Sequence, residues 1–251
     1  MFTACSWPPN GYEASETALA GIMEIRVQPD VEAVAAAAAR EIACTAREAV
    51  AARGRFVLAV SGGRTPWKML RALTCEQVPW DRVYVVQVDE RVAPPEHPDR
   101  NLVHLRESLL GCVSLLAKQI QAMPVDFPDL ETASRNYAHV LQGIAGIPPV
   151  LDLVHLGLGA DGHTASLIPG DPVLQVTEAD VAPTQPYQGR RRMTLTYPIL
   201  NRARRILWVV TGADKAEMLL RLCEGELTIP ASRVRRDRTL VLADPAAAGK
   251  L

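Results

Sequence analysis

Residues 151–166 read LDLVHLGLGADGHTAS, and this stretch decides the fold class that the sequence predicts. Its first half is a short apolar run of the kind found in the buried strands of parallel sheets. The run stops at a glycine-rich polar loop that carries Asp161 and His163. In open parallel sheets, ligands bind at the loops that follow the carboxyl ends of the strands. The stretch therefore also indicates where chemistry should be sought.

The same pattern of apolar run and polar exit recurs along the chain. Further strands are expected at residues 56–60, 82–88, 205–211 and, less clearly, 238–243. Helices are expected at residues 30–53, 66–74, 101–111, 129–145 and 213–223. Asp30 is placed to cap the first of these helices and Gly54 to end it. Because strands and helices alternate, the sequence predicts an α/β protein with a Rossmann-like, mostly parallel sheet and helices on both faces.

Length and composition favour a single globular domain. The chain has 251 residues, of which 48% are hydrophobic and 22% charged, and its formal net charge is -1. These values speak against disordered, fibrous and membrane classes and give no general attraction to nucleic acid or to a membrane. Residues 1–21 show no clear period and no secretory signal. We therefore expect a disordered N-terminal extension there, one α/β domain over residues 22–251, and a cytoplasmic location.

Two other classes of site find little support. The arginine-rich segment 233–238 suggests nucleic-acid binding, but it lacks interleaved aromatic residues, so a solvated face is favoured. The five cysteines lie scattered, with no C-x-x-C spacing. Without such spacing or a cysteine and histidine cluster, we expect no metal site.

Residues 61–66, SGGRTP, form the first of three loops that carry chemistry. The backbone amides of Gly62 and Gly63 can approach an anion closely, and the helix that begins here favours negative charge at its start. Thr65, after Arg64, is available as the N-cap of that helix. Neither a P-loop nor a dinucleotide fingerprint is present. The loop predicts a phosphate site, with a tight turn and a capped helix as the alternative.

The second loop is DER at residues 89–91, directly after the strand predicted at 82–88. The sheet edge brings these charges near the predicted phosphate loop. Arg91 is a candidate donor to phosphate or carboxylate oxygens, and Asp89 is a candidate to hold a sugar hydroxyl or to orient a neighbour. An ordinary solvated turn is the alternative.

In the third loop, Gly159 and Gly162 lie on the two sides of Asp161, and His163 follows two residues after it. An imidazole titrates near neutral pH, so His163 can act as a base toward water and then as an acid toward a leaving alkoxide. A lone histidine is more often structural, but its place at a strand's carboxyl end favours a catalytic role.

Two further basic positions complete the candidate set. Lys215 lies in the first turn of the helix predicted at 213–223, where a cation opposes the helix dipole. This placement indicates either an exposed, screened side chain or an anionic ligand nearby. Arg192 ends a run of three arginines at 190–192, at least one of which is placed to reach a substrate.

Five motifs, in this order, resemble the 6-phosphogluconolactonases: SGGRTP at 61–66, DER at 89–91, GLGADGHTASLIPG at 157–170, MTLT at 193–196 and GADKA at 212–216. The resemblance implies the fold shared with the glucosamine-6-phosphate deaminases. It also implies hydrolysis of 6-phospho-D-glucono-1,5-lactone to 6-phosphogluconate, the second step of the oxidative pentose phosphate pathway. A phosphosugar lactone would be the ligand, with no cofactor, and the protein would be a monomer or a small homo-oligomer.

Two alternatives compete with this interpretation. The deaminase pattern has an acidic residue five positions after the histidine, where this chain has Ile168. Isoleucine cannot relay a proton, so this chain lacks the acidic group that the deaminase reaction uses at that position. A non-catalytic sugar-phosphate sensor would need an output module, and no helix-turn-helix pattern precedes the α/β region.

The mechanism expected from the resemblance uses the loop at 62–65, Lys215 and Arg91 to anchor the phosphate. His163 would then deprotonate the water that attacks the lactone carbonyl. Asp161 would orient either the imidazole or the sugar, a choice that the sequence leaves open.

Overall fold

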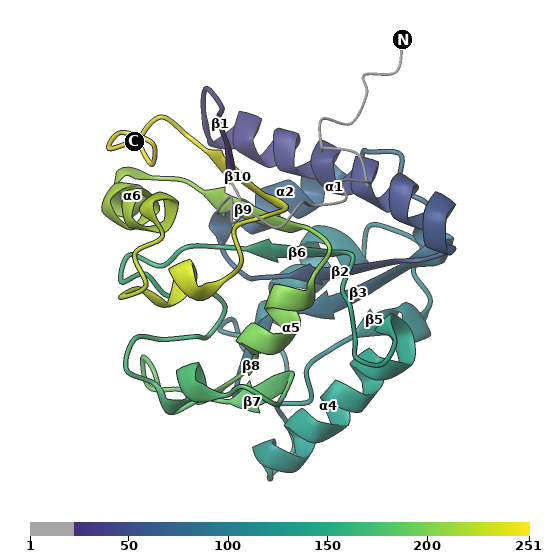
Figure 1. Cartoon of the computed structure of the whole chain (residues 1–251). Coiled ribbons are helices and arrows are strands. Elements are labelled where there is room, and N and C mark those ends of the chain that lie inside the picture. The colour runs from purple at the N-terminus through teal and green to yellow at the C-terminus, as the bar shows by residue number, and fades with distance from the viewer. Residues whose placement is uncertain (1–22) are drawn as a thin grey trace, which may run out of the picture.

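The computed structural model describes residues 23–251 and is built around a sheet of seven parallel strands (Figure 1). The strands lie in the order β1-β10-β9-β6-β2-β3-β5. Their bounds are β1 Glu24–Val27, β2 Phe56–Val60, β3 Val83–Gln87, β5 Ile120–Gln121, β6 Leu153–Leu156, β9 Ile206–Val210 and β10 Thr239–Ala243. Every strand predicted from an apolar run is present, within one to two residues at each end, and the predicted fold class is confirmed.

The central strands are apolar throughout because both of their faces are covered. In β2, Phe56 and Leu58 face one hydrophobic cluster, while Val57 and Ala59 face the other. All five residues of β2 are buried. A continuous apolar run is what a parallel strand between two helical layers requires.

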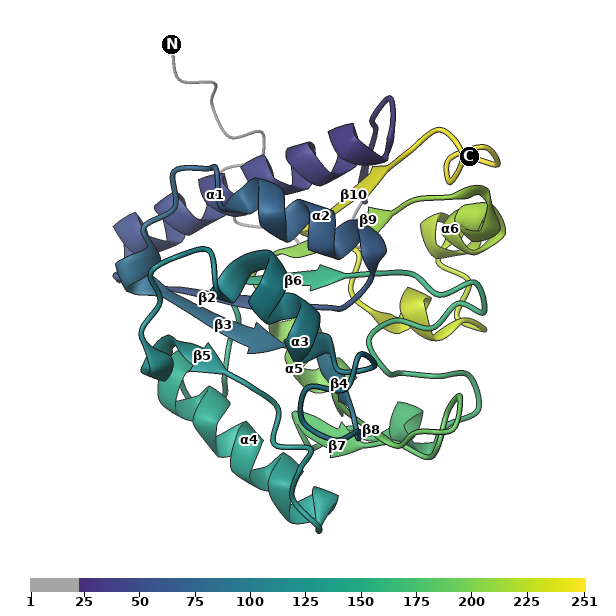
Figure 2. The ribbon, with the colours of Figure 1, turned by 180° about the vertical axis from the view of Figure 1, so that it is seen from behind.

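One face of the sheet is covered by α1 (Val31–Arg53), α2 (Arg64–Leu73) and α3 (Asn101–Leu105), as Figure 2 shows. The alanines of α1 let this long helix lie close to α2 and to the strands. The carboxylate of Asp30 accepts a hydrogen bond from the amide of Ala33, and Gly54 ends the helix with φ 73°. Both predicted ends of this helix are confirmed.

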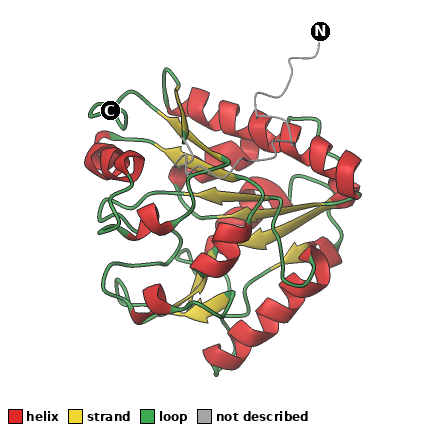
Figure 3. Ribbon diagram, viewed as in Figure 1, coloured by secondary structure: helices red, strands yellow, loops and turns green. Residues whose placement is uncertain are grey.

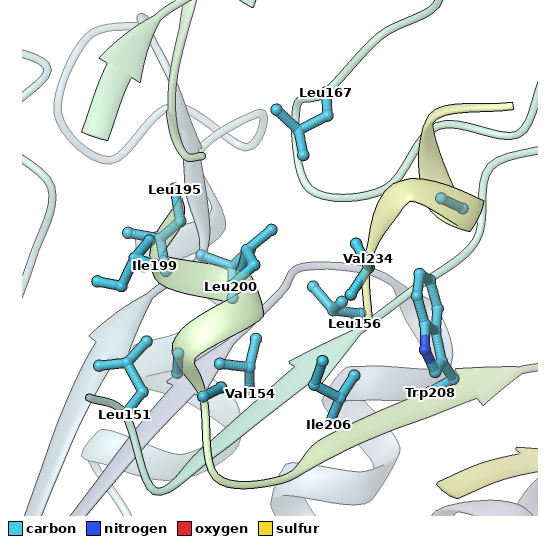
Figure 4. Close-up of a cluster of buried hydrophobic side chains, with 14 of the residues drawn as sticks. Leu151, Val154, Leu156, Leu167, Leu195, Ile199, Leu200, Ile206, Trp208 and Val234 are labelled. Atoms are coloured by element: carbon cyan, nitrogen blue, oxygen red, sulfur yellow. The ribbon is translucent and has the colours of Figure 1, made fainter. Parts of the chain in front are cut away.

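The opposite face is covered by α4 (Leu130–Ala145), α5 (Tyr197–Arg202) and α6 (Ala216–Glu224). Figure 3 shows helices on both sides of the strands. In Figure 4, Leu156 of β6 and Ile206 and Trp208 of β9 lie on the same side of the sheet as Leu200 of α5. The predicted helix at 101–111 is α3 followed by a π-helical turn, Arg106–Leu110.

A second, antiparallel sheet lies beside the carboxyl ends of the strands, in the order β4-β8-β7. Its strands are β4 Asp89–Arg91, β8 Arg192–Leu195 and β7 Val181–Pro183. The sequence predicted a loop at 89–91, and this was wrong, because these residues pair with β8. Since Arg91 pairs with Arg192, the small sheet brings two distant basic residues to one place.

No helix within residues 23–251 is long and apolar enough to cross a membrane. The extension predicted at residues 1–21 lies outside the described residues, and the assignment of 22–251 as a single domain stays a prediction.

Candidate active site

A pocket of about 310 Å³ opens at the carboxyl edge of the central sheet. It is formed by the segments that follow β2, β6 and β9, together with β4 and β8. Nine of the ten residues singled out from the sequence line it: Gly62, Gly63, Arg64, Thr65, Asp89, Arg91, His163, Arg192 and Lys215. The tenth, Asp161, does not line the pocket but contacts His163.

The loop between β2 and α2 forms one wall of the pocket. Gly63 has φ 134°, a conformation that L side chains rarely adopt, so the turn requires glycine. The helix begins at Arg64 with Gly63 as its cap residue. The prediction that Thr65 is the N-cap was therefore wrong. Its hydroxyl instead lies 2.7 Å from that of Thr211, which joins this loop to the end of β9.

Asp89 and Arg192 both line the pocket and are linked through the Ser166 hydroxyl. The Ser166 hydroxyl donates to Oδ2 of Asp89 at 2.6 Å, and Nη1 of Arg192 lies 3.4 Å from the same hydroxyl. Burial lowers the pKa of Arg192, while the charge of Asp89 opposes that effect. The carboxylate therefore helps to keep a buried cation in place beside the cavity.

The middle residue of the charged triplet, Glu90, faces away from the pocket and is fully buried. Its carboxylate accepts hydrogen bonds from the backbone amides of Asn101 and Leu102, at the start of α3. Asn101 in turn donates through its side chain to the backbone carbonyl of Asp89 at 3.0 Å. Asn101 also lines the pocket, although no sequence pattern pointed to it.

His163 and Asp161 form a hydrogen-bonded pair. Nδ1 of His163 lies 2.5 Å from Oδ1 of Asp161, and the His163 backbone amide donates to the same oxygen at 3.2 Å. The hydrogen bond from His163 is the main cause that holds the pKa of Asp161 well below its ordinary value. With Nδ1 donating to a carboxylate, a neutral imidazole keeps Nε2 as its proton acceptor.

Glycines make room for this pair. A Cβ on Gly159 would lie 2.1 Å from Nδ1 of His163 and 2.5 Å from Oδ1 of Asp161. Gly162 has φ 81°, and a Cβ there would meet Ile229. The glycine-rich exit of β6 is therefore needed both for the turn and for the approach of the two side chains.

Tyr187 makes contacts that no sequence pattern predicted. Its hydroxyl donates to Oδ2 of Asp161 at 3.1 Å, and its ring meets that of His163 edge to face, with centroids 5.8 Å apart. The guanidinium of Arg192 lies over the tyrosine ring, 5.0 Å from its centroid. The only local sign in the sequence is Gln188-Gly189, a dipeptide suited to a tight turn.

Lys215 reaches the pocket from the loop after β9. Gly212 takes φ 98° there, and its amide donates to both carboxylate oxygens of Asp244, at 3.0 and 3.2 Å. The ammonium group of Lys215 lies 3.1 Å from Asp214 at the mouth of the pocket. Of the arginines at 190–192, Arg190 pairs with Asp99 and Arg191 bonds the carbonyl of Thr184, so only Arg192 lines the pocket.

Among residues 23–251, no group of three or more His, Cys, Asp and Glu side chains is arranged to hold a metal ion. The pocket instead gathers four cationic side chains, those of Arg64, Arg91, Arg192 and Lys215. Such a pocket suits a small anion, and a histidine base beside it can accept a proton from a water or a hydroxyl group.

The fold is that of the glucosamine-6-phosphate deaminase-like α/β enzymes. A monomeric glucosamine-6-phosphate deaminase superposes with a TM-score of 0.79 at 21% identity, over 91% of this chain and all of that one. The 6-phosphogluconolactonase from Trypanosoma cruzi gives 0.83 at 22% identity, over 93% of this chain and 98% of that one.

The chain belongs to the family described as glucosamine-6-phosphate isomerases/6-phosphogluconolactonase, whose model matches residues 29–242. A 6-phosphogluconolactonase of Nostoc is 34% identical, over 90% of this chain and 96% of the relative. That of Mycobacterium tuberculosis is 36% identical, over 90% and 98%. That of Rattus norvegicus is 37% identical, over 73% and 75%. Within the family, the chain is a hydrolase of the lactonase branch.

Proposed function

We propose that this enzyme hydrolyses 6-phospho-D-glucono-1,5-lactone to 6-phosphogluconate, the second step of the oxidative pentose phosphate pathway. The observation that carries the proposal is the placement of a histidine base in the same pocket as four cationic side chains and a glycine-rich helix start. An enzyme that hydrolyses a phosphorylated lactone needs one set of groups to bind the phosphate and another group to activate water. The substrate named for the relatives supports this choice.

The phosphate would bind at the start of α2, where the amides of Gly62 and Gly63 and the positive end of the helix dipole favour an anion. Arg64, Thr65 and Lys215 line the same pocket. Anchoring the phosphate there would place the lactone carbonyl, at the other end of the sugar, beside His163. Binding energy from this remote group then fixes the geometry of the reacting atoms.

His163 would begin the reaction by taking a proton from water through Nε2. The water oxygen forms a bond to the lactone carbonyl carbon, and the carbonyl electron pair moves onto oxygen. When the tetrahedral intermediate collapses, the ring C–O bond breaks and the departing alkoxide takes the proton back from His163. Asp161 would hold the imidazole and stabilise its charged form.

Two guanidinium groups would stabilise the developing oxyanion. Within the described chain, the Nε atoms of Arg91 and Arg192 are buried and have no hydrogen-bond partner. Unsatisfied cationic donors beside a cavity are suited to charge that develops only during the reaction. Asp89, held by Ser166 and Asn101, would accept a hydrogen bond from a sugar hydroxyl.

Deamination of glucosamine 6-phosphate is the competing function because that enzyme shares the fold. At the position of its acidic residue, this chain has Ile168, which is buried and only 6% exposed. A hydrocarbon side chain cannot pass a proton during ring opening, which favours the lactonase function.

The test offers the purified protein freshly generated 6-phosphogluconolactone and, separately, glucosamine 6-phosphate. Acid release is followed for the first compound, corrected for spontaneous hydrolysis, and ammonia release for the second. We expect rapid acid release and no ammonia. Ammonia release without lactone hydrolysis would assign the chain to the deaminases. A cytoplasmic location, a monomeric or small oligomeric state and the absence of a nucleic-acid partner belong to the same proposal.

A further inference from the structure

We propose that Tyr187 is a positioning residue, which locks Asp161 in the orientation that aims His163 at the substrate. The inference rests on the proposed function, since it assumes that His163 is the base. It adds a residue from a separate segment of the chain to the pair formed at the end of β6. Three contacts of Tyr187 support it.

The first contact is the hydrogen bond from the Tyr187 hydroxyl to Oδ2 of Asp161, at 3.1 Å. The other carboxylate oxygen, Oδ1, accepts from Nδ1 of His163. Because each oxygen has its own donor, the carboxylate cannot rotate without losing one of the two bonds. Tyr187 thereby fixes the plane of the carboxylate, and the carboxylate fixes the imidazole.

The second and third contacts hold the tyrosine ring itself. On one side the ring meets His163 edge to face, with an angle of 64° between the planes. On another side lies the guanidinium of Arg192. The charged and titratable groups around Tyr187 are therefore Asp161, His163 and Arg192. The tyrosine ring therefore connects two sets of contacts. On one side are the hydrogen bonds that join Asp89, Ser166 and Arg192, and on the other is the pair formed by Asp161 and His163.

The backbone around Tyr187 is a tight hairpin. Tyr187 and Arg190 exchange two backbone hydrogen bonds, of 2.9 and 3.2 Å, across a two-residue turn. The turn residues Gln188 and Gly189 have φ 52° and 79°, the values of a type I′ hairpin. The guanidinium of Arg190 binds Asp99 at 2.5 Å. The hairpin is thus anchored to a second segment, so Tyr187 is held in position before any ligand binds.

The test is Tyr187→Phe, which keeps the ring and its contact with Arg192 and removes only the hydroxyl. We expect kcat for the lactone to fall about tenfold, the size expected for one lost hydrogen bond to a charged group, with KM changed less than about twofold. Tyr84→Phe, at a tyrosine of β3 outside the pocket, is the matched control and should retain wild-type rates.

A double-mutant cycle with Asp161→Asn separates positioning from a general structural effect. If Tyr187 acts through Asp161, adding Tyr187→Phe to Asp161→Asn should reduce kcat by much less than it does in the wild type. A full additional loss of about tenfold would overturn the inference, as would wild-type kinetics in the single variant. If the wild-type protein does not hydrolyse the lactone, the proposed function fails instead. The Nδ1 proton resonance of His163, compared between wild type and Tyr187→Phe, then still tests the contact: an unchanged resonance would contradict it.

Discussion

Asn101 lies so close to Gly62 that a Cβ at position 62 would stand 2.0 Å from its Oδ1 atom. Two hydrogen bonds fix the position of Asn101: its side-chain amide donates to the carbonyl of Asp89, and its backbone amide donates to the carboxylate of Glu90. Asn101 therefore links the loop at residues 62–65 to β4, so a displacement of one would disturb the other. Position 62 must be glycine for the proposed phosphate site to keep its shape.

The first prediction is that Gly62→Ala raises KM for the lactone by about tenfold or more, since a displaced loop loses the aligned amides that bind phosphate. Steady-state kinetics measure the change. Gly143→Ala is the control, because Gly143 lies in α4 and no atom lies within 4 Å of the place where the new methyl group would stand. This control should leave the kinetics unchanged and raise the melting temperature slightly. An unchanged KM in Gly62→Ala would contradict the assignment of the loop.

The second prediction concerns Lys215. Replacing it with methionine keeps the aliphatic stem and removes the charge, so we expect KM to rise about 10- to 100-fold, the usual effect of losing one charge-assisted hydrogen bond, while kcat falls less. Lys250→Met is the control, since Lys250 pairs with Glu217 on the surface. Inhibition by inorganic phosphate should weaken in parallel in Lys215→Met. A fall in kcat with KM unchanged would show that Lys215 acts on the reacting atoms and not on the phosphate.

The third prediction concerns pH and stability. His155 of β6 is fully buried, its Nδ1 accepts from the amide of Ser61, and burial lowers its pKa from 6.5 to about 3. The folded state keeps this histidine neutral, while the unfolded state takes up a proton as the pH falls below about 6.5. Its contribution to stability is therefore complete above about pH 6.5 and is lost as the pH falls toward about 3.

Urea unfolding of the wild type and of His155→Asn at about pH 7, 6 and 5 tests this linkage. Below about pH 6, the free energy of unfolding of the wild type should fall faster than that of the variant, by up to about 1.4 kcal/mol per pH unit. Equal pH slopes for the two proteins would show that folding does not lower the pKa of His155.

Local signals in the sequence predicted most of the central sheet and both ends of α1. Asp30 and Gly54 act through neighbours within a few residues, so their roles can be read from the sequence. The apolar runs identified the strands because both faces of the sheet are buried. Since chemistry in such sheets gathers at the carboxyl ends of the strands, the segments that follow them identified eight residues that line one pocket, and the arginine run at 190–192 supplied the ninth, Arg192.

Features that depend on tertiary contacts could not be predicted in this way. The strand Asp89–Arg91 is too short and too charged to show a pattern, and it exists because β8 pairs with it. Thr65 has the side chain of a helix cap, but the helix already begins at Arg64, after Gly63 with its positive φ. The Thr65 hydroxyl therefore bonds the hydroxyl of Thr211 instead. Tyr187 meets Asp161 across 26 residues of chain, and only the folded hairpin shows that contact.

The most direct test of the central claim is the turnover of His163→Ala on freshly generated 6-phosphogluconolactone, measured beside the wild type. Removal of the proposed base should lower kcat by about 10²- to 10⁴-fold. KM should change little, because the residues proposed to bind the phosphate stay in place. Near-normal turnover in this variant would contradict the account, because the reaction would then proceed without the residue on which the mechanism depends.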